Sequence, residues 1–171
     1  MTVLDAIKGR FSVRSYTSQP VSDSDLSKIL EAARFSQSAK NFQDWRFVVV
    51  RDESMKQKLV PACRNQHFVA EASVVIACCG INIDYVMTCG QNTYNLDVTI
   101  AMENMALVAH ELNLGTCWLG AFYEDQVKAL LGIPVDGVRI VGILAIGHPA
   151  VQASQKNREP LETIVRYEKW S

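Results

Sequence analysis

Two apolar runs without polar alternation constrain the fold most strongly. ASVVIACCG occupies residues 72–80, and GVRIVGILAIGHP occupies residues 137–149. Both are rich in β-branched residues and apolar on both faces, which is typical of strands covered on both sides of a sheet. WRFVVVR, residues 45–51, is a β-branched run between polar boundaries and predicts a third strand. The chain therefore needs a sheet whose inner strands are buried by other elements.

Two helices are predicted before the first strand. Thr2 can cap a helix that has Leu4, Ile7 and Phe11 on one face and a glycine near its end. Ser22 can cap a second helix, because an aspartate follows three residues later and an apolar staple flanks the cap. The polar residues 36–44 between this helix and the first strand are expected to form a loop.

The longest predicted helix covers residues 97–114 and ends at Gly115. It is apolar almost all round, which indicates burial by several neighbours. Shorter helices are expected at 53–63 and 124–131, while residues 82–96 have no clean period and are predicted as a loop leading into the long helix. Helices come first and strands interrupted by helices follow, an order that favours a mixed α+β fold over a regular βαβ array.

Composition narrows the class of protein. A chain of 171 residues suits one domain, and 49% hydrophobic residues leave room for a subunit interface. The net charge of -1 gives no argument for nucleic acid or an anionic membrane as partner. No apolar run approaches the length of a membrane span, and the N-terminal residues do not resemble a signal peptide. We expect a cytoplasmic protein.

The cysteines do not form a ligand motif. Their number, five, is odd, and no CxxC occurs. Cys63 and His67 have ligand-like spacing, but a second ligand pair is missing, so we expect no metal site. Buried, reduced thiols in the cytoplasm are the preferred interpretation.

Familiar catalytic signatures do not occur. The chain contains no GxGxxG, no GxxxxGK[ST] and no GxSxG motif. His110 lies in the long predicted helix among apolar residues and is interpreted as a core histidine rather than a base. Because the protein groups offer no convincing acid–base or nucleophilic set, an enzyme with this sequence would rely on a cofactor.

Five stretches carry a resemblance when they are taken together. These are RFSVR (10–14), SAKNFQDWRFV (38–48), DVTIAMENM (97–105), LGTCWLG (114–120) and KNR (156–158). In this order, over essentially the whole chain, they resemble the FMN-dependent nitroreductase family in its compact form. The resemblance implies a nitroreductase-like three-layer α+β fold, in which helices flank a central, mostly antiparallel sheet.

The same resemblance divides the chain and implies a dimer. Residues 1–150 would form a single FMN-binding domain, and residues 151–171 a C-terminal arm that wraps the partner subunit of a homodimer. The polar connector 152–160 has no core pattern, whereas residues 161–170 form an apolar tail that must cover something. FMN would then bind at the subunit interface.

The two arginines of RFSVR suit an anion. The forked N–H donors of Arg10 and Arg14 can hold a phosphate, and Ser12 can add a hydroxyl. A solvated basic face is the alternative, and composition alone favours it. The resemblance favours the phosphate of FMN, with Arg158 and Lys156 completing the neutralisation. The implied cofactor-binding residues are Arg10, Phe11, Ser12, Arg14, Ser38, Ala39, Asn41, Gln43, Leu119, Gly120, Lys156 and Arg158.

The loop before the first strand is expected to meet the flavin ring. By resemblance, Asn41 hydrogen-bonds the polar edge of the isoalloxazine, since an amide offers both a donor and an acceptor. Gln43 is a second candidate for that edge, and loop capping is the alternative for both side chains. Ser38 and Ala39 match positions that approach the flavin from the other subunit.

A turn at Leu119 and Gly120 would face its backbone N–H towards flavin N5, where glycine permits close approach. Trp118 either shields the ring or belongs to the core. Two positions depart from the family, which often has proline where this chain has Gln37 and Asp44. The first departure makes the loop less rigid, and the second puts a carboxylate near the site, which disfavours an anionic substrate.

The implied activity is ping-pong hydride transfer. NADH or NADPH would reduce flavin N5, and a nitroaromatic, a quinone or a similar small-molecule acceptor would then be reduced at the same face, with no dedicated catalytic side chain. One alternative is the reduction of a specific metabolite, such as an enone or a halogenated aromatic. Another is a non-catalytic flavin-binding protein for storage or sensing.

Overall fold

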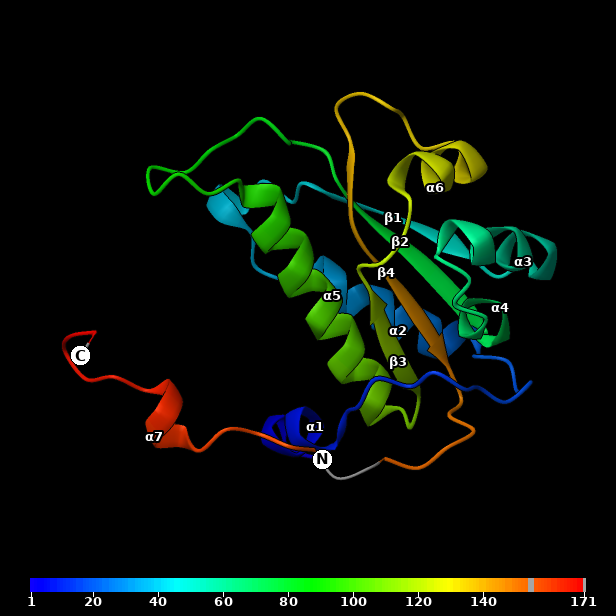
Figure 1. The fold of residues 1–171 in the computed structure, drawn as a ribbon, viewed down its shortest axis with the longest axis horizontal. Helices are drawn as coiled ribbons and strands as arrows, with labels where there is room; N and C mark the ends of the chain where they lie inside the picture. Colours follow the sequence, from blue (N-terminus) through cyan, green and yellow to red (C-terminus); the bar gives the residue numbers. More distant parts are fainter. Residues whose placement is uncertain (154–155, 171) are drawn as a thin grey trace.

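The fold is built on a four-stranded antiparallel sheet (Figure 1), in a computed structural model that describes residues 1–153 and 156–170. The strands are β1 (Trp45–Val50), β2 (Val74–Gly80), β3 (Gly115–Leu119) and β4 (Arg139–Gly147). Their order is β1-β2-β4-β3, and every pair is antiparallel. The two unalternating apolar runs thus form the two central strands, as the sequence predicts.

Strand β2 shows why the alternation is missing. All seven of its residues are buried. Even-numbered residues from 74 to 78 belong to one hydrophobic cluster, and odd-numbered residues from 75 to 79 belong to the cluster on the opposite face. Because successive side chains of a strand point to opposite faces, a strand between two cores must be apolar at every position.

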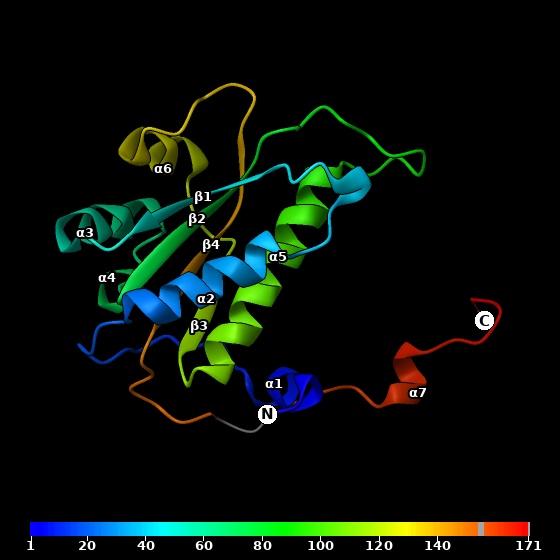
Figure 2. The ribbon, with the colours of Figure 1, turned by 180° about the vertical axis from the view of Figure 1, so that it is seen from behind.

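Helices cover both faces and complete three layers. On one face α2 (Asp23–Arg34) and α5 (Thr93–Glu111) lie side by side, as Figure 2 shows. The opposite face packs against α3 (Glu53–Ala62), α4 (Phe68–Glu71) and α6 (Glu124–Leu131). The predicted three-layer α+β architecture is confirmed, although α4 was not expected from the sequence.

Helix α2 begins where its cap predicts. The backbone N–H of Asp25 donates to the Ser22 hydroxyl at 3.0 Å. Val21 and Leu26, which flank the cap, are both buried in the same cluster. The cap and the apolar contact together fix the entry of the chain into the helix.

The bounds predicted for the long helix are wrong at both ends. Helix α5 begins at Thr93 rather than at residue 97. It ends before Asn113, whose φ of 61° is left-handed and whose N–H donates to His110 O at 3.0 Å. Gly115 does not end the helix, because it is the first residue of β3.

Residues 115–119 form an edge strand where the sequence indicated only a turn after the helix. Gly115 is needed for packing, since a Cβ there would lie 2.4 Å from Cγ2 of Val13. The Val13 N–H donates to Thr116 O at 2.9 Å, and Ser12 forms a parallel bridge with Thr116. The N-terminal segment therefore runs alongside β3.

Helix α1 (Val3–Gly9) begins with a capping box formed by Thr2 and Asp5, whose backbone N–H groups and side chains bond reciprocally. Of its predicted apolar face, Phe11 packs against the core, whereas Leu4 and Ile7 do not. Leu4 and Ile7 are 56% and 50% exposed, and Ala6 is the buried residue of the helix. The exposed part of this face is available to another molecule.

Residues 159–170 of the C-terminal arm stand away from the rest of the chain in both views (Figures 1 and 2), whereas Lys156 contacts α1. The regular structure of the arm within the described residues is the single turn α7 (Leu161–Ile164). Leu161, Ile164, Tyr167 and Trp170 are all exposed, Trp170 by 98%. The tail that was expected to cover an apolar surface covers none on its own subunit.

The state of the cysteines, a metal site and a membrane span are three further points on which the sequence makes a prediction. Cys63, Cys78, Cys79 and Cys117 are buried and free, as predicted, whereas Cys89 is exposed. Among the residues described, no three His, Cys, Asp or Glu side chains gather as a metal site would require. No helix in this part of the chain combines the length and the apolarity needed to cross a membrane.

Candidate cofactor site

Three cationic side chains, those of Arg10, Lys156 and Arg158, lie close together at the C-terminal end of α1, and Arg14 follows four residues after Arg10. We name Arg10, Arg14, Lys156 and Arg158 the basic cluster. Arg10 is the C-cap residue of α1, and Lys156 Nζ donates to Lys8 O at 2.5 Å, which satisfies a free carbonyl at the end of that helix. The structure thus brings together, within one chain, two stretches that lie about 150 residues apart in the sequence.

The basic cluster lacks counter-charges of its own. Within residues 1–153 and 156–170, no ion pair involves any of its four members. The Arg10 Nε is buried without a hydrogen-bond partner in the same residues. Burial, and next the charges of Arg10 and Arg158, lower the pKa of Lys156. Gathered like charges of this kind are stabilised by an anion.

His110, interpreted from the sequence as a core histidine, lies half-buried beside the basic cluster. It is the penultimate residue of α5, and its ring packs so tightly on Gly9 that a Cβ there would lie 2.3 Å from Nε2. Burial, and next Lys156 and Arg10, lower its pKa. A cavity of about 280 Å³ opens here, lined by Arg10, Phe11, His110, Asn113, Leu114, Gly115, Thr116 and Pro149.

Within RFSVR, the side chain of Val13 is buried in the core. Arg14 and Ser12 are exposed, and Phe11 and Arg10 are half-buried. Arg14 and Arg10 both act electrostatically on Cys117 of β3, whose pKa is raised chiefly by burial. The two arginines therefore flank the same edge of the sheet, with the Ser12 hydroxyl between them in the sequence. Two guanidinium forks and a hydroxyl form a suitable donor set for a phosphate.

Residues 38–44, here called the 38–44 loop, contain a short 3₁₀ helix, η1 (Ala39–Asn41). Lys40, Asn41 and Gln43 have φ angles of 49°, 57° and 54°, a left-handed conformation that is uncommon for residues other than glycine. The Gln43 N–H donates to the Ser38 hydroxyl at 3.0 Å. Ser38, Asn41 and Gln43 thus belong to one compact, strained unit.

The 38–44 loop also presents an aromatic pair. The ring of Phe42 meets that of Tyr85 edge to face, with centroids 5.0 Å apart. The Lys40 ammonium lies 5.0 Å from the centroid of the Tyr85 ring. Asn41 and Gln43 are exposed beside this pair. The side-chain NH₂ group of Gln43 caps the loop, because its Nε2 donates to Asn41 O at 3.3 Å.

Leu119 and Gly120 lie at the far end of β3 from Thr116. Four residues of strand place Gly120 about 13 Å from Thr116. Leu119 is buried, whereas Gly120 is exposed, and a Cβ built on it would meet nothing within 4 Å. The backbone at Gly120 is therefore open to close approach by a flat group. Trp118 packs against the core on the α5 face.

Apart from Leu119 and Gly120, the predicted site residues form two groups at opposite ends of α5. The basic cluster adjoins His110 near the C-terminal end, and the 38–44 loop is tied to Asp97 near the N-terminal end (Figure 1). Thirteen residues of helix separate Asp97 from His110 by about 20 Å. One chain on its own does not bring the two groups face to face.

Comparison with known proteins decides the family. A family model described as the Nitroreductase family matches residues 7–80 and 64–148. The chain belongs to the nitroreductase family. A protein of Archaeoglobus fulgidus is 35% identical over 153 residues, which cover 85% of this chain and 84% of that protein.

Two further nitroreductase relatives extend the comparison. The FMN reductase (NAD(P)H) of Bacillus subtilis is 26% identical, over 95% of this chain and 72% of that protein. The crystal structure of a nitroreductase family protein from Clostridium difficile 630 superimposes with a TM-score of 0.88 at 28% identity, over 99% of both chains. The nitroreductase resemblance inferred from the five stretches is thereby confirmed.

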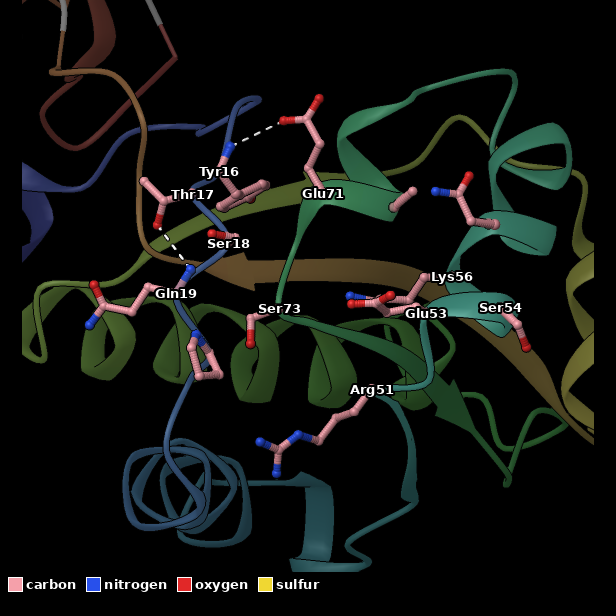
Figure 3. A pocket seen from close by; sticks show the side chains of 13 residues that line it. Tyr16, Thr17, Ser18, Gln19, Arg51, Glu53, Ser54, Lys56, Glu71 and Ser73 are labelled. Atoms are coloured by element: carbon pink, nitrogen blue, oxygen red, sulfur yellow. Dashed lines mark hydrogen bonds between the residues drawn. The ribbon is translucent and has the colours of Figure 1, made fainter.

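A larger cavity of this nitroreductase, about 620 Å³, contains none of the predicted site residues (Figure 3). Its polar groups are engaged in holding the chain together. The Tyr16 N–H donates to the Glu71 carboxylate at 3.2 Å, and Lys56 Nζ donates to Ala72 O at 2.6 Å. The Ser73 hydroxyl accepts a bond from Val21 N–H at 2.8 Å. The contacts of Tyr16 and Val21 join the segment after Arg14 to α4 and to the residue before β2, and the contact of Lys56 joins α3 to the residue after α4.

Asp97, which was not foreseen from the sequence, lies against the 38–44 loop. Asp97 is 4% exposed, and both of its carboxylate oxygens lie 3.1 Å from the Ala39 nitrogen. Burial, partly opposed by this bond and reinforced by nearby Asp44, raises its pKa. The sequence did contain a signal, because Asp97 directly precedes the apolar residues of the long helix. An acidic residue is rarely buried without a partner, so an acid at a buried helix position indicates a specific contact.

Proposed function

We propose that this chain is an FMN-dependent oxidoreductase that uses NADH or NADPH and works as a homodimer. The observation that carries the proposal is the basic cluster. Four cations without a carboxylate partner among the described residues, one of them with a buried unpartnered nitrogen, match a phosphate that is largely dianionic at pH 7. The family and the FMN reductase relative support FMN as the carrier of that phosphate.

When bound, FMN supplies the redox chemistry, taking hydride at N5 from NADH or NADPH and then reducing a nitroaromatic, a quinone or a similar acceptor in a ping-pong cycle. The chain supplies binding and orientation. Arg10 and Arg14 would hold the phosphate through paired N–H donors, and Ser12 would add a hydroxyl. Lys156 and Arg158 would neutralise the remaining charge. The exposed backbone at Gly120 would lie against the ring.

The second half of the site would come from the partner subunit. The chain's own 38–44 loop lies at the opposite end of α5 from its basic cluster, so we assign Ser38, Ala39, Asn41 and Gln43 to the flavin held by the other copy. The exposed apolar face of α1 and the exposed arm support a large interface between copies. The arm, residues 151–171, would wrap the partner.

Anaerobic reduction of the purified protein tests this proposal. We expect a yellow protein that releases about one FMN per chain, the stoichiometry that one basic cluster per chain implies. NADH or NADPH should bleach the flavin without oxygen, and a panel of nitroaromatics, quinones, enones and halogenated aromatics should restore its colour at different rates. A flavin that neither nucleotide bleaches would indicate a storage or sensing protein, and a colourless chain that takes up no added FMN would refute the flavin site itself.

A further inference from the structure

The 38–44 loop needs an anchor outside itself. Three of its residues, Lys40, Asn41 and Gln43, adopt left-handed backbone conformations, each of which is unfavourable for a side chain that bears a Cβ. Such strain persists only where the surroundings impose it. The contacts that hold this loop therefore matter for function, because the loop carries the side chains assigned to the flavin.

Several of the loop's hydrogen bonds run within it. The Gln43 N–H bonds to the Ser38 hydroxyl, the Asn41 N–H to Ser38 O at 3.1 Å, and the Phe42 N–H to Ala39 O at 2.9 Å. These bonds define the shape of the loop but do not attach it to the sheet or to a helix. At its C-terminal end, the loop is attached where Ile81 N–H donates to Asp44 O at 3.0 Å.

The N-terminal half of the loop is attached through Asp97. The Ala39 N–H donates to this carboxylate, with both oxygens 3.1 Å from the nitrogen, across a sequence separation of 58 residues. Asp97 is 4% exposed and stands on α5, the long helix packed against the sheet. A buried charged acceptor makes a stronger hydrogen bond than a neutral one.

We propose that Asp97 is a positioning residue that holds the 38–44 loop in the conformation in which it presents Ser38, Asn41 and Gln43 to the flavin. Asp97 acts through Ala39 and touches no cofactor. The effect on the loop is a property of the chain alone, and the effect on flavin binding rests on the proposed function.

The chemistry of the site explains why an acid is suited to this position. A carboxylate offers acceptors only, so either oxygen receives the Ala39 N–H without reorientation. An asparagine offers one oxygen and an NH₂ group that would itself need an acceptor. Nearby Asp44 raises the pKa of Asp97 and so opposes its charge, whereas the bond from the Ala39 N–H lowers that pKa and favours the carboxylate. Aspartate is therefore preferred, and asparagine is the conservative variant.

Hydrogen–deuterium exchange on the full-length protein as purified tests the anchor independently of catalysis. In Asp97→Ala we expect the amides of Ala39 and Gln43 to exchange at least about tenfold faster, since loss of a charged hydrogen bond corresponds to a factor of that order. Asp97→Asn should give a smaller increase. The amides of β2 should be unchanged in both variants, which excludes global unfolding.

Asp125→Ala is the matched control. Asp125 is an exposed acid on α6, with no side-chain bond among the described contacts, and its loss should leave loop exchange at the parent rate. Unchanged exchange of Ala39 and Gln43 in Asp97→Ala would overturn the positioning role. If Asp97→Ala does not fold, Asp97→Asn is compared with the parent instead. If Asp97→Asn then shows the parent's exchange rates at Ala39 and Gln43 and the parent's flavin affinity, the positioning role is overturned.

Titration with FMN and with riboflavin tests the consequence for the cofactor. Asp97→Ala should weaken both flavins by a similar factor of about ten, because the loop is assigned to the ring and not to the phosphate. Asp97→Asn should recover part of the loss. Faster loop exchange with unaltered affinity for both flavins would overturn the assignment of the loop to the ring. A parent protein that binds neither flavin would refute the proposed function, while the exchange experiment still decides the anchor.

Discussion

The two ends of α5 differ in how their polar groups are satisfied. At the C-terminal end, the basic cluster has charges without counter-charges among the described residues. At the N-terminal end, the 38–44 loop is strained, but it is bonded within itself and to Asp97. One end therefore gathers charge that an anion would neutralise. The other end holds a strained loop in one shape through hydrogen bonds, although Oδ2 of Asp44 in that loop is also buried without a partner among the described residues. We interpret them as the phosphate half and the ring half of a cofactor site that two chains share.

Removal of the C-terminal residues should have the largest effect. Truncation after Pro149 deletes Lys156 and Arg158 together with the apolar arm, so we expect loss of FMN and loss of the dimer. An arm with Trp170 exposed needs a partner surface, and an interface built on it contributes to folding. Light scattering measures the mass, and flavin absorbance measures the bound FMN.

A double variant separates the two contributions of that segment. Lys156→Ala with Arg158→Ala should keep the dimer mass and lose most of the FMN, since only the charges are removed. Truncation after Pro160 keeps both charges and should lose the dimer. A protein truncated after Pro149 that stays a soluble monomer and still binds FMN tightly would contradict both the shared site and the wrapped arm.

Arg10→Ala should weaken FMN selectively. Loss of a charged hydrogen bond of about 1.5–3 kcal/mol corresponds to roughly ten- to a hundred-fold in affinity. Riboflavin lacks the phosphate, so its affinity should scarcely change. Isothermal titration with both flavins measures the difference, and Lys28→Ala, an exposed cation paired with Asp25, is the control. Equal losses for the two flavins would make Arg10 a structural residue.

Asn41→Gly should have a smaller and unselective effect. Glycine tolerates the φ of 57°, so the loop keeps its backbone while the side-chain amide is lost. A neutral hydrogen bond of about 1 kcal/mol predicts a loss of roughly five-fold in affinity. FMN and riboflavin should weaken alike, in contrast to Arg10→Ala. A loss confined to FMN would place Asn41 with the phosphate half.

Cys117→Ser should have the smallest effect. The thiol lies buried in β3, and burial raises its pKa, so it is protonated at neutral pH and is not a nucleophile. NAD(P)H oxidation should stay within about three-fold of the parent, a range set by repacking of a slightly altered core. A loss of about a hundred-fold with FMN still bound, equivalent to nearly 3 kcal/mol, would reveal a redox thiol.

The elements foreseen from the sequence are those with local signals. Strands β2 and β4 are continuous apolar runs, and Ser22 caps α2 through a bond to a residue three positions away. Strand β3 was missed, because five residues that begin with glycine carry no period, and their pairing with β4 and with Ser12 is not local in the sequence. The start of α5 was missed because Asn92 makes no side-chain cap bond.

In the candidate site, too, residues with a local signal were foreseen and contacts between distant residues were not. The resemblance supplied the members of both halves, and the structure places Arg10 and Lys156 together at one end of α5. The anchor at Asp97 was not foreseen, because its partner is the backbone of Ala39, 58 residues away, and no motif encodes that bond. The position of His110 beside Gly9 depends likewise on how α1 packs on α5.

Subunit complementation tests the shared site most directly. One chain carries Arg10→Ala with Arg14→Ala, and the other carries Ser38→Ala with Asn41→Gly, so each homodimer has every site damaged. When differently tagged chains are co-expressed and the heterodimer is isolated, one of its two sites combines the intact basic cluster of one chain with the intact loop of the other. We predict one FMN per two chains, bound with parent affinity. A heterodimer with no tight FMN would contradict the account, because each site would then be built within a single chain.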